Sequence, residues 1–189
     1  MAIETDRLRL RPFAGSDAAD VFEYLRAPAV NCFACMKLPS LGAAQALMRE
    51  RAAAAAEGEF AFAIELKAAG KVIGEIDASP EPGGSGPGPG GPMDTFSPCW
   101  MLNPAYQRRG YAYEAARAFL DYLFTEKGAR RIYAYTEDYN LACQRLCEKL
   151  GMRREGLFKE FVSFVNGPDG QPIYENTFQY AILRKEWRG

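Results

Sequence analysis

Hydrophobic and polar residues alternate with two different periods in the first quarter of the chain, and the periods distinguish strands from helices. Arg7–Arg11 alternates leucine with arginine, which predicts a strand with one buried face. Ser16 precedes a predicted helix whose apolar residues recur at steps of three and four, namely Ala18, Val21, Phe22 and Leu25. Ser40 is a suitable N-cap for an alanine-rich helix that runs to about Glu57.

The second quarter of the chain predicts three strands. Residues 59–66 and 71–77 form a hairpin around the turn at Ala69-Gly70. A further strand is predicted at 95–102. Strands that follow one another in this way favour an antiparallel sheet.

A segment rich in proline and glycine separates two of these strands, at about residues 79–93. This composition predicts a polar, irregular loop, most simply a passive insertion. Residues 86–91 match the pattern G-x-G-x-x-G, but that pattern binds a dinucleotide only where it follows a strand and opens a helix. Two prolines remove amide donors here and no helix follows, so we reject a dinucleotide site.

The remaining chain alternates helix and strand. A helix beginning at about Tyr111 carries a stripe of small and apolar residues: Ala112, Ala115, Ala116, Phe119, Leu120 and Leu123. A strand is predicted at 131–136, and a second helix lies between a suitable N-cap, Asn140, and Gly151, which suits the left-handed position after a helix end. Two final strands are joined by a turn at 166–170.

The junction between the strand ending at Leu102 and the helix beginning near Tyr111 has the chemistry of a phosphate site. The first turn of a helix presents unpaired N–H groups and the positive end of the helix dipole, so anions bind there. Gly110 permits close approach of the backbone to a ligand, and Arg108 and Arg109 add charge and forked donors.

Together these segments resemble the GNAT superfamily of acyl-CoA-dependent N-acyltransferases. Gln107, Gly110 and Ala112 occupy the places of its Gln/Arg-x-x-Gly-x-Gly/Ala pyrophosphate loop. Residues 140–152 resemble its second cofactor helix, which contains an asparagine and ends in Glu-Lys-Leu-Gly. Residues 3–13, 154–157 and 180–187 are similar to the RimJ/RimL branch, which includes acetyltransferases of ribosomal-protein N-termini.

The resemblance implies a single domain over residues 1–189 with an α/β fold. Its mixed, largely antiparallel sheet would have a splayed central strand pair and flanking helices, so that pantetheine lies between strands ending near Leu102 and Thr136. Backbone groups of Met101, Leu102 and Asn103 would then be free to pair with pantetheine amides. The residues expected to bind acetyl-CoA are Met101, Leu102, Asn103, Gln107, Arg108, Arg109, Gly110, Tyr111, Ala112, Asn140 and Cys143.

The resemblance also suggests catalytic groups. The amide at Leu102 would polarise the thioester carbonyl. The branch places a serine, and many family members a tyrosine, beside the CoA sulfur; Cys143 and Cys147 stand at these positions, so Cys143 is the candidate acid. The candidate bases are Glu160, Glu75, Asp77 and Glu137.

Composition limits the chemistry further. The net charge is −1, which gives no electrostatic reason to expect nucleic acid or a membrane surface as a partner. The chain contains no histidine, which excludes Ser-His-Asp and Cys-His sites and HExxH metalloenzymes. Cys32 and Cys35 form a C-x-x-C pair without a second ligand pair, so no metal is expected. We find no signal run and no transmembrane-length apolar segment, which favours a cytoplasmic protein.

The predicted function is transfer of acetyl from acetyl-CoA to a primary amine. A protein N-terminal α-amine, with a pKa of about 8, is easier to deprotonate than lysine at about 10.4, so a weak base suffices for it. Asn176 stands where the branch often shows aspartate. Two alternatives stay open: a small amine such as a polyamine or antibiotic as acceptor, and an acyl-CoA-binding sensor with little turnover. The sequence does not decide the oligomeric state, with a homodimer as one option.

Overall fold

The computed structural model describes residues 2–56, 61–81 and 92–189. It divides into two compact units, which are described separately below. Unit 1 comprises residues 1–29, 36–78 and 99–119, and unit 2 comprises residues 30–35, 79–98 and 120–189. Predictions for residues 57–60 and 82–91 lie outside the described residues. The single-domain organisation stays a prediction.

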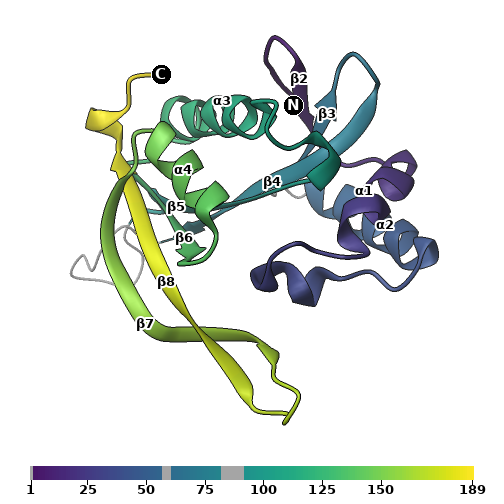
Figure 1. Cartoon of the computed structure of the whole chain (residues 1–189). Coiled ribbons are helices and arrows are strands. Elements are labelled where there is room, and N and C mark those ends of the chain that lie inside the picture. The colour runs from purple at the N-terminus through teal and green to yellow at the C-terminus, as the bar shows by residue number, and fades with distance from the viewer. Residues whose placement is uncertain (1, 57–60, 82–91) are drawn as a thin grey trace. The chain divides into compact units, whose positions relative to one another are not determined.

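The described chain is built from eight strands and four α-helices (Figure 1). The strands are β1 (Ile3–Glu4), β2 (Leu8–Arg11), β3 (Ala61–Leu66), β4 (Lys71–Glu81), β5 (Thr95–Leu102), β6 (Arg131–Glu137), β7 (Arg153–Asn166) and β8 (Pro172–Leu183). The helices are α1 (Ala18–Leu25), α2 (Leu41–Ala56), α3 (Tyr111–Thr125) and α4 (Leu141–Lys149), and short 3-10 turns include Asn31–Met36 and Pro104–Tyr106.

The strands form one sheet in the order β1-β2-β3-β4-β5-β6-β8-β7. β1 pairs antiparallel with β2, β2 with β3, and β3 with β4, as do β6 with β8 and β8 with β7. β5 and β6 are parallel. The predicted α/β fold with a mixed, largely antiparallel sheet and flanking helices is therefore confirmed.

The parallel pairing of β5 with β6 is short. In the described residues its register contains Thr95 opposite Arg131 and Phe96 opposite Ile132, near the first residues of both strands. Pro98 follows on β5 and has no N–H to donate to a ladder. The parallel ladder is thus confined to the start of the two strands.

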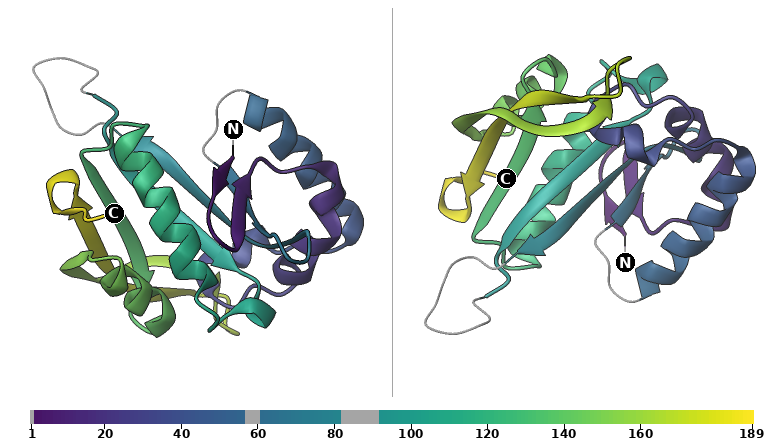
Figure 2. Two further views of the ribbon diagram at one scale, coloured as in Figure 1. Left: turned by 90° about the horizontal axis from the view of Figure 1, so that it is seen from above. Right: turned by 90° about the horizontal axis from the view of Figure 1, so that it is seen from below.

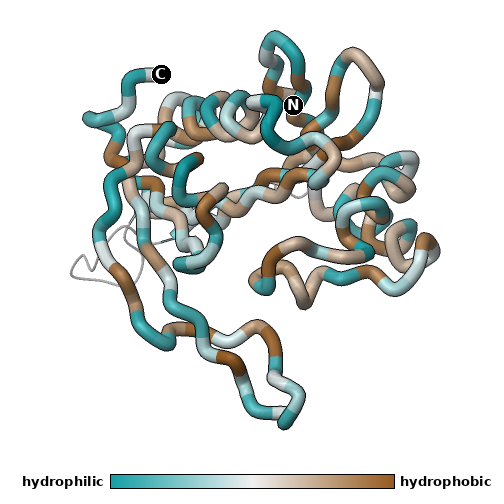
Figure 3. Tube along the Cα trace, in the orientation of Figure 1, coloured by the Kyte–Doolittle hydropathy of each residue, from teal (hydrophilic) through white to brown (hydrophobic). Residues whose placement is uncertain are grey.

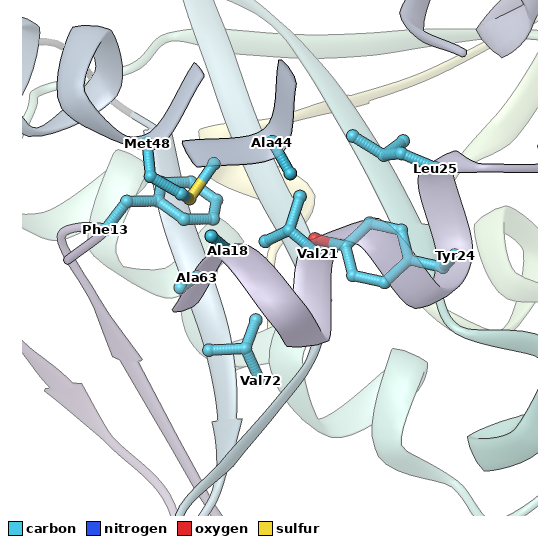
Figure 4. Close-up of a cluster of buried hydrophobic side chains, with 9 residues drawn as sticks. All are labelled: Phe13, Ala18, Val21, Tyr24, Leu25, Ala44, Met48, Ala63 and Val72. Atoms are coloured by element: carbon cyan, nitrogen blue, oxygen red, sulfur yellow. The ribbon is translucent and has the colours of Figure 1, made fainter. Parts of the chain in front are cut away.

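Unit 1 has a core between two helices and the strands β3 and β4 (Figure 4). Its buried side chains are Phe13, Ala18, Val21, Tyr24, Leu25, Ala44, Met48, Ala63 and Val72. Ala18, Val21 and Leu25 of α1 are apolar positions that the sequence periodicity predicts, whereas Tyr24 of α1 and the two residues of α2 were not predicted. Ser40 accepts a hydrogen bond from the Ala43 N–H at 3.2 Å, which confirms the predicted cap of α2.

Unit 2 contains a long hairpin of β7 and β8, which lie side by side (Figures 1 and 2). Hydrophobic and hydrophilic segments alternate along both strands (Figure 3). Gly170 has a φ of 80° and its N–H donates to Gly167 O at 2.9 Å, so the predicted turn is present. An aromatic cluster includes Tyr135, Phe158 and Phe161, whose ring centroids are 5.0 to 6.1 Å apart.

Two elements differ from the sequence-based prediction. β1 was not predicted, because its two residues are held by pairing with β2 rather than by any local pattern. Residues 79–81, predicted as the start of the irregular loop, instead continue β4. Glu81 there accepts hydrogen bonds from the Tyr133 hydroxyl at 2.7 Å, a contact between segments that are far apart in sequence.

Candidate active site

The end of β5 in unit 1 lies very close to Gly74 on β4. A Cβ atom placed on Gly74 would come within 2.3 Å of the Met101 carbonyl oxygen and 3.0 Å of the Leu102 Cα. Both contacts are to backbone, so no change of side-chain rotamer could relieve them. Gly74 therefore sets the position of the two residues expected to bind pantetheine and to polarise the thioester.

Asn103 ends this strand and is built into the following turn. It is buried, and its N–H donates to Ile73 O at 2.8 Å. Its side chain accepts from the Ala105 N–H at 3.0 Å and donates to Glu23 at 3.2 Å. The expectation that the Asn103 N–H is free for pantetheine is thus wrong, because β4 already uses that donor. The structure supports a positioning role for Asn103.

The predicted phosphate loop connects this turn to α3. Arg108 has a φ of 61° and Gly110 a φ of 84°, so the chain turns sharply before the helix begins at Tyr111. Gln107 donates from its side chain to Leu102 O at 3.4 Å. Within the described part of the chain, the backbone N–H groups of residues 108–112 have no hydrogen-bond partner. Unpaired N–H groups at a helix start bind anions.

The positive charge at this loop is accessible to solvent. Arg108 and Arg109 are both exposed, and the Arg109 guanidinium lies 5.6 Å from the centre of the Tyr106 ring. Neither arginine is in an ion pair with another described residue. Their guanidinium groups are consequently available to a phosphate, as the sequence predicts.

Arg7 and Glu114 hold the loop in place, and sequence reasoning missed both. The Arg7 guanidinium donates to Arg109 O at 3.0 Å and to Glu114 at 2.6 Å, and lies 4.6 Å from the centre of the Tyr111 ring. Thr5 also donates to Glu114, at 2.6 Å. Burial would raise the pKa of Glu114, but the hydrogen bonds from Thr5 and Arg7 outweigh it and lower that pKa. The sequence did contain one signal for Glu114, because an acidic residue in the first turn of the helix predicted to begin near Tyr111 interacts favourably with the helix dipole.

Unit 2 carries the predicted second cofactor helix, α4. Asn140 caps it by accepting from the Cys143 N–H at 3.2 Å, and it also donates to Glu137 at 3.3 Å. Gly151 has a φ of 79° after the helix end. The predicted N-cap and helix end are confirmed, whereas the role of Asn140 toward the cofactor stays a prediction.

The two cysteines of α4 differ in exposure. Cys147 is fully buried and Cys143 is half-buried. A hydrogen bond with the Cys143 thiol, together with burial, raises the pKa of Cys147 well above that of an ordinary thiol. Cys147 therefore stays protonated as a core residue, and Cys143 is the more accessible of the pair.

The candidate bases lie in different settings. Glu75 is buried in unit 1, where it accepts from the Tyr24 hydroxyl at 2.8 Å and from the Arg51 guanidinium at 2.9 Å. Burial and the charge of Glu75 raise the pKa of Tyr24 well above its ordinary value. Asp77 is half-buried on the same strand. With both oxygens engaged, Glu75 is better suited to holding unit 1 together than to accepting a proton.

The other two candidate bases are in unit 2. Glu160 is exposed, has a φ of 47°, and donates its N–H to the Asn176 side chain at 3.0 Å. Asn176 in turn donates to Asp138 at 2.8 Å. Glu137 is buried at the end of β6. The base assignment, including that of Glu160, stays a prediction.

The described residues show neither a metal site nor a membrane-spanning helix. They contain no group of three or more side chains suited to hold a metal ion. The Cys35 thiol of the C-x-x-C pair contacts Cys32 O at 4.0 Å, and none of the five cysteines, all of which lie within the described ranges, is in a disulfide. None of the helices described is long and apolar enough to cross a membrane.

The chain matches a known protein family. A model of the acetyltransferase (GNAT) domain matches residues 7–153, which is well over half of the chain. The chain belongs to the GNAT family. Members of this family use acetyl-CoA.

Curated relatives match part of the chain. The uncharacterized N-acetyltransferase YnaD of Bacillus subtilis (strain 168) is 42% identical over 93 residues, covering 49% of this chain and 51% of YnaD. The spermidine N(1)-acetyltransferase of Escherichia coli (strain K12) is 33% identical over 84 residues, covering 44% of each protein. The chain thus spans about half the length of the curated relatives it matches.

Solved structures match nearly the whole chain. A GNAT-family acetyltransferase from Bacillus anthracis superposes with a TM-score of 0.81 at 29% identity, covering 98% of this chain and 100% of that one. RimL, a ribosomal L7/L12 α-N-protein acetyltransferase solved with coenzyme A, superposes with a TM-score of 0.75 at 14% identity, covering 97% and 98%. The second likeness concerns the fold alone.

Proposed function

We propose that this protein is an acetyl-CoA-dependent N-acetyltransferase that acts on a primary amine. The observation that carries the proposal is the row of unpartnered N–H groups over residues 108–112, flanked by two exposed arginines at the start of α3. This arrangement suits the diphosphate of coenzyme A. Binding energy gained there, remote from the thioester, helps to orient the reacting carbonyl.

The proposed reaction needs only a few groups of the protein. The acceptor ammonium must first lose a proton to solvent, after which its nitrogen forms a bond to the acetyl carbon, loses a second proton, and the carbon–sulfur bond breaks. The Leu102 amide would stabilise the developing oxyanion, and Cys143 would donate a proton to the leaving thiolate. The second proton lost by the nitrogen replaces the one that Cys143 gives up, through solvent or a carboxylate, so that one proton is released to solvent in each turnover.

Either an N-terminal α-amine or a small amine fits this proposal. The RimJ/RimL resemblance and the lower pKa of an α-amine favour a protein N-terminus. A third option, a sensor that binds acyl-CoA without turnover, predicts tight CoA binding and no amine-dependent release of thiol. Measuring thiol release from acetyl-CoA over N-terminal peptides, polyamines and aminoglycosides tests the proposal, and no release with any of them would reject it.

Replacing Gly110 with alanine is expected to weaken coenzyme A binding about tenfold or more. Its φ of 84° disfavours a side chain, and an added Cβ would lie 3.2 Å from Arg7 Nη2, so the loop must change shape. Isothermal titration calorimetry with coenzyme A measures the effect.

Gly70→Ala is the matched control for Gly110. Gly70 also has a positive φ, 59°, but lies in the β3–β4 turn with no atom within 4 Å of an added Cβ. It should show similar backbone strain with unchanged coenzyme A affinity. Equal affinities for Gly110→Ala and the original protein would contradict the phosphate assignment.

Replacing Cys143 with alanine is expected to lower kcat about tenfold or more while leaving coenzyme A affinity within about twofold. The reason is that the thiol acts on the leaving group only as the C–S bond breaks. Cys143→Ser should retain most of the activity, since it supplies the hydroxyl found in the related branch. Steady-state kinetics of thiol release checks both variants, and equal kcat values for Cys143→Ala and the original would assign Cys143 to packing.

A further inference from the structure

Three buried polar side chains of unit 2 lie on one face of the strand pair β6–β8. Glu137 is 4% exposed, Glu175 is 6% exposed and Thr177 is 4% exposed. Glu137 is directly opposite Thr177 in the antiparallel register, so their side chains are on the same face. Glu175 is two residues before Thr177 on β8 and therefore shares that face.

Only neutral groups donate to the two carboxylates. Glu175 accepts from the Asn31 side-chain amide at 2.5 Å and from the Tyr139 hydroxyl at 3.1 Å. Glu137 accepts from the Asn140 amide at 3.3 Å. Neither carboxylate forms an ion pair with a described lysine or arginine, and residues 1, 57–60 and 82–91 include none of either type.

The pKa of the Tyr139 hydroxyl indicates that the negative charges of both carboxylates act on the same group. Burial raises the pKa of Tyr139, and the charges of Glu137 and Glu175 raise it further, against a hydrogen bond with the Asn31 backbone that lowers it. Both charges consequently reach the same phenol. This concentrates negative charge around a single position in unit 2.

The Thr177 hydroxyl supplies an independent observation. It is buried, and it has no hydrogen-bond partner among the described residues. A buried hydroxyl without a partner destabilises the fold, and so do buried carboxylates without a cation. A ligand that brings both N–H donors and positive charge would offset all three costs at once.

The protonation state of the reacting amine indicates which kind of amine substrate these carboxylates suit. The amine that attacks the thioester must first lose its proton, and two carboxylates beside it would raise its pKa and hold it as the unreactive ammonium. The two carboxylates are therefore better suited to an ammonium group that stays charged throughout the reaction, which a peptide with a single amine at its N-terminus lacks. A diamine or polyamine keeps a second ammonium group that does not react.

We propose that Glu137, Glu175 and Thr177 bind the non-reacting ammonium group of a diamine or polyamine acceptor. This rests on the proposed function and selects the small-amine class over the protein N-terminus. Glu137 thereby becomes a specificity residue rather than the general base. The ammonium donates to the two carboxylates and to the threonine hydroxyl oxygen, each of which is an acceptor.

A matched pair of substrates tests the proposal. 1,5-Diaminopentane and pentylamine have the same chain, but only the diamine has a second ammonium group. We expect the protein to prefer the diamine about 10- to 100-fold in kcat/KM. The double variant Glu137→Gln with Glu175→Gln should lose most of that preference, because its kcat/KM for the diamine falls, through KM, much further than its kcat/KM for pentylamine.

Controls separate this inference from folding and from the proposed function. Glu126→Gln, an exposed change in unit 2, should keep the preference. Millimolar spermidine should raise the Tm of the original protein more than that of the double variant, a readout independent of turnover. Equal losses for both substrates, or preference for a tetra-alanine peptide over the diamine, would overturn the inference and leave the acetyltransferase proposal intact. Absence of thiol release with every amine would instead reject the proposed function.

Discussion

Replacing Gly74 with alanine is expected to lower kcat/KM about 100-fold and the free energy of unfolding by about 1–3 kcal/mol. The added Cβ would lie 2.3 Å from the Met101 carbonyl oxygen, so the end of β5 must move by a large part of an ångström. Leu102 would move with it, and the amide that we propose polarises the thioester would be displaced from the carbonyl. Urea unfolding and steady-state thiol release measure the two effects.

A comparison of kcat with coenzyme A affinity in Gly74→Ala distinguishes a displaced end of β5 from an unfolded protein. The phosphate loop begins five residues after Leu102, so coenzyme A affinity should fall much less than kcat. Gly15→Ala is the matched control, because no atom lies within 4 Å of a Cβ at Gly15 and its φ is not positive. It should change stability by less than about 0.5 kcal/mol and leave activity unchanged. Full activity in Gly74→Ala would show that the position of β5 does not depend on this close approach.

Replacing Glu75 with glutamine is expected to lower the free energy of unfolding by about 2–4 kcal/mol. Glu75 and Arg51 are both largely buried, with side chains 6% and 17% exposed, so the variant leaves a guanidinium without its counter-charge. Tyr24 also loses a charged acceptor for its hydroxyl. Urea unfolding at neutral pH, followed by circular dichroism, measures the loss.

A triple variant and a surface control test whether the uncompensated charge of Arg51 causes the loss of stability. Arg51→Met, Glu75→Leu and Tyr24→Phe together remove all three polar groups and should recover most of the lost stability. Glu4→Gln breaks an exposed pair with Arg9 and should leave the urea midpoint nearly unchanged. If Glu75 were the general base instead, Glu75→Gln would abolish turnover under conditions in which the protein is fully folded, with no recovery in the triple variant.

Local patterns predicted most helices and the turn that precedes α3 correctly. The stripe from Ala112 to Leu123, the Asn140 cap and the position of Gly151 each depend on residues within a turn or two of one another. Helix capping and amphipathic periodicity are interactions at this range, so the sequence states them directly. The strands at 95–102 and 131–136 were found for the same reason.

Contacts between distant residues were not predictable in this way. Arg7 and Glu114, which brace the loop, are 107 residues apart, and Glu75 lies 24 residues from Arg51. The sequence offered Glu75 as a candidate base because nothing local indicates that a cation and a phenol engage it. The continuation of β4 to Glu81, within a segment whose composition predicts a loop, likewise coincides with a distant contact to Tyr133.

The sequence by itself determined the family, the order of most elements and the turn before α3 that we propose binds a phosphate, because short-range spacing encodes them. The tertiary structure alone decided that β8 lies between β6 and β7, and that Glu137 and Glu175 share one face with Thr177. Strand order and register arise from pairing between segments remote in the chain, where a shift of one residue exchanges the two faces of a strand. No periodicity within a single segment carries that information.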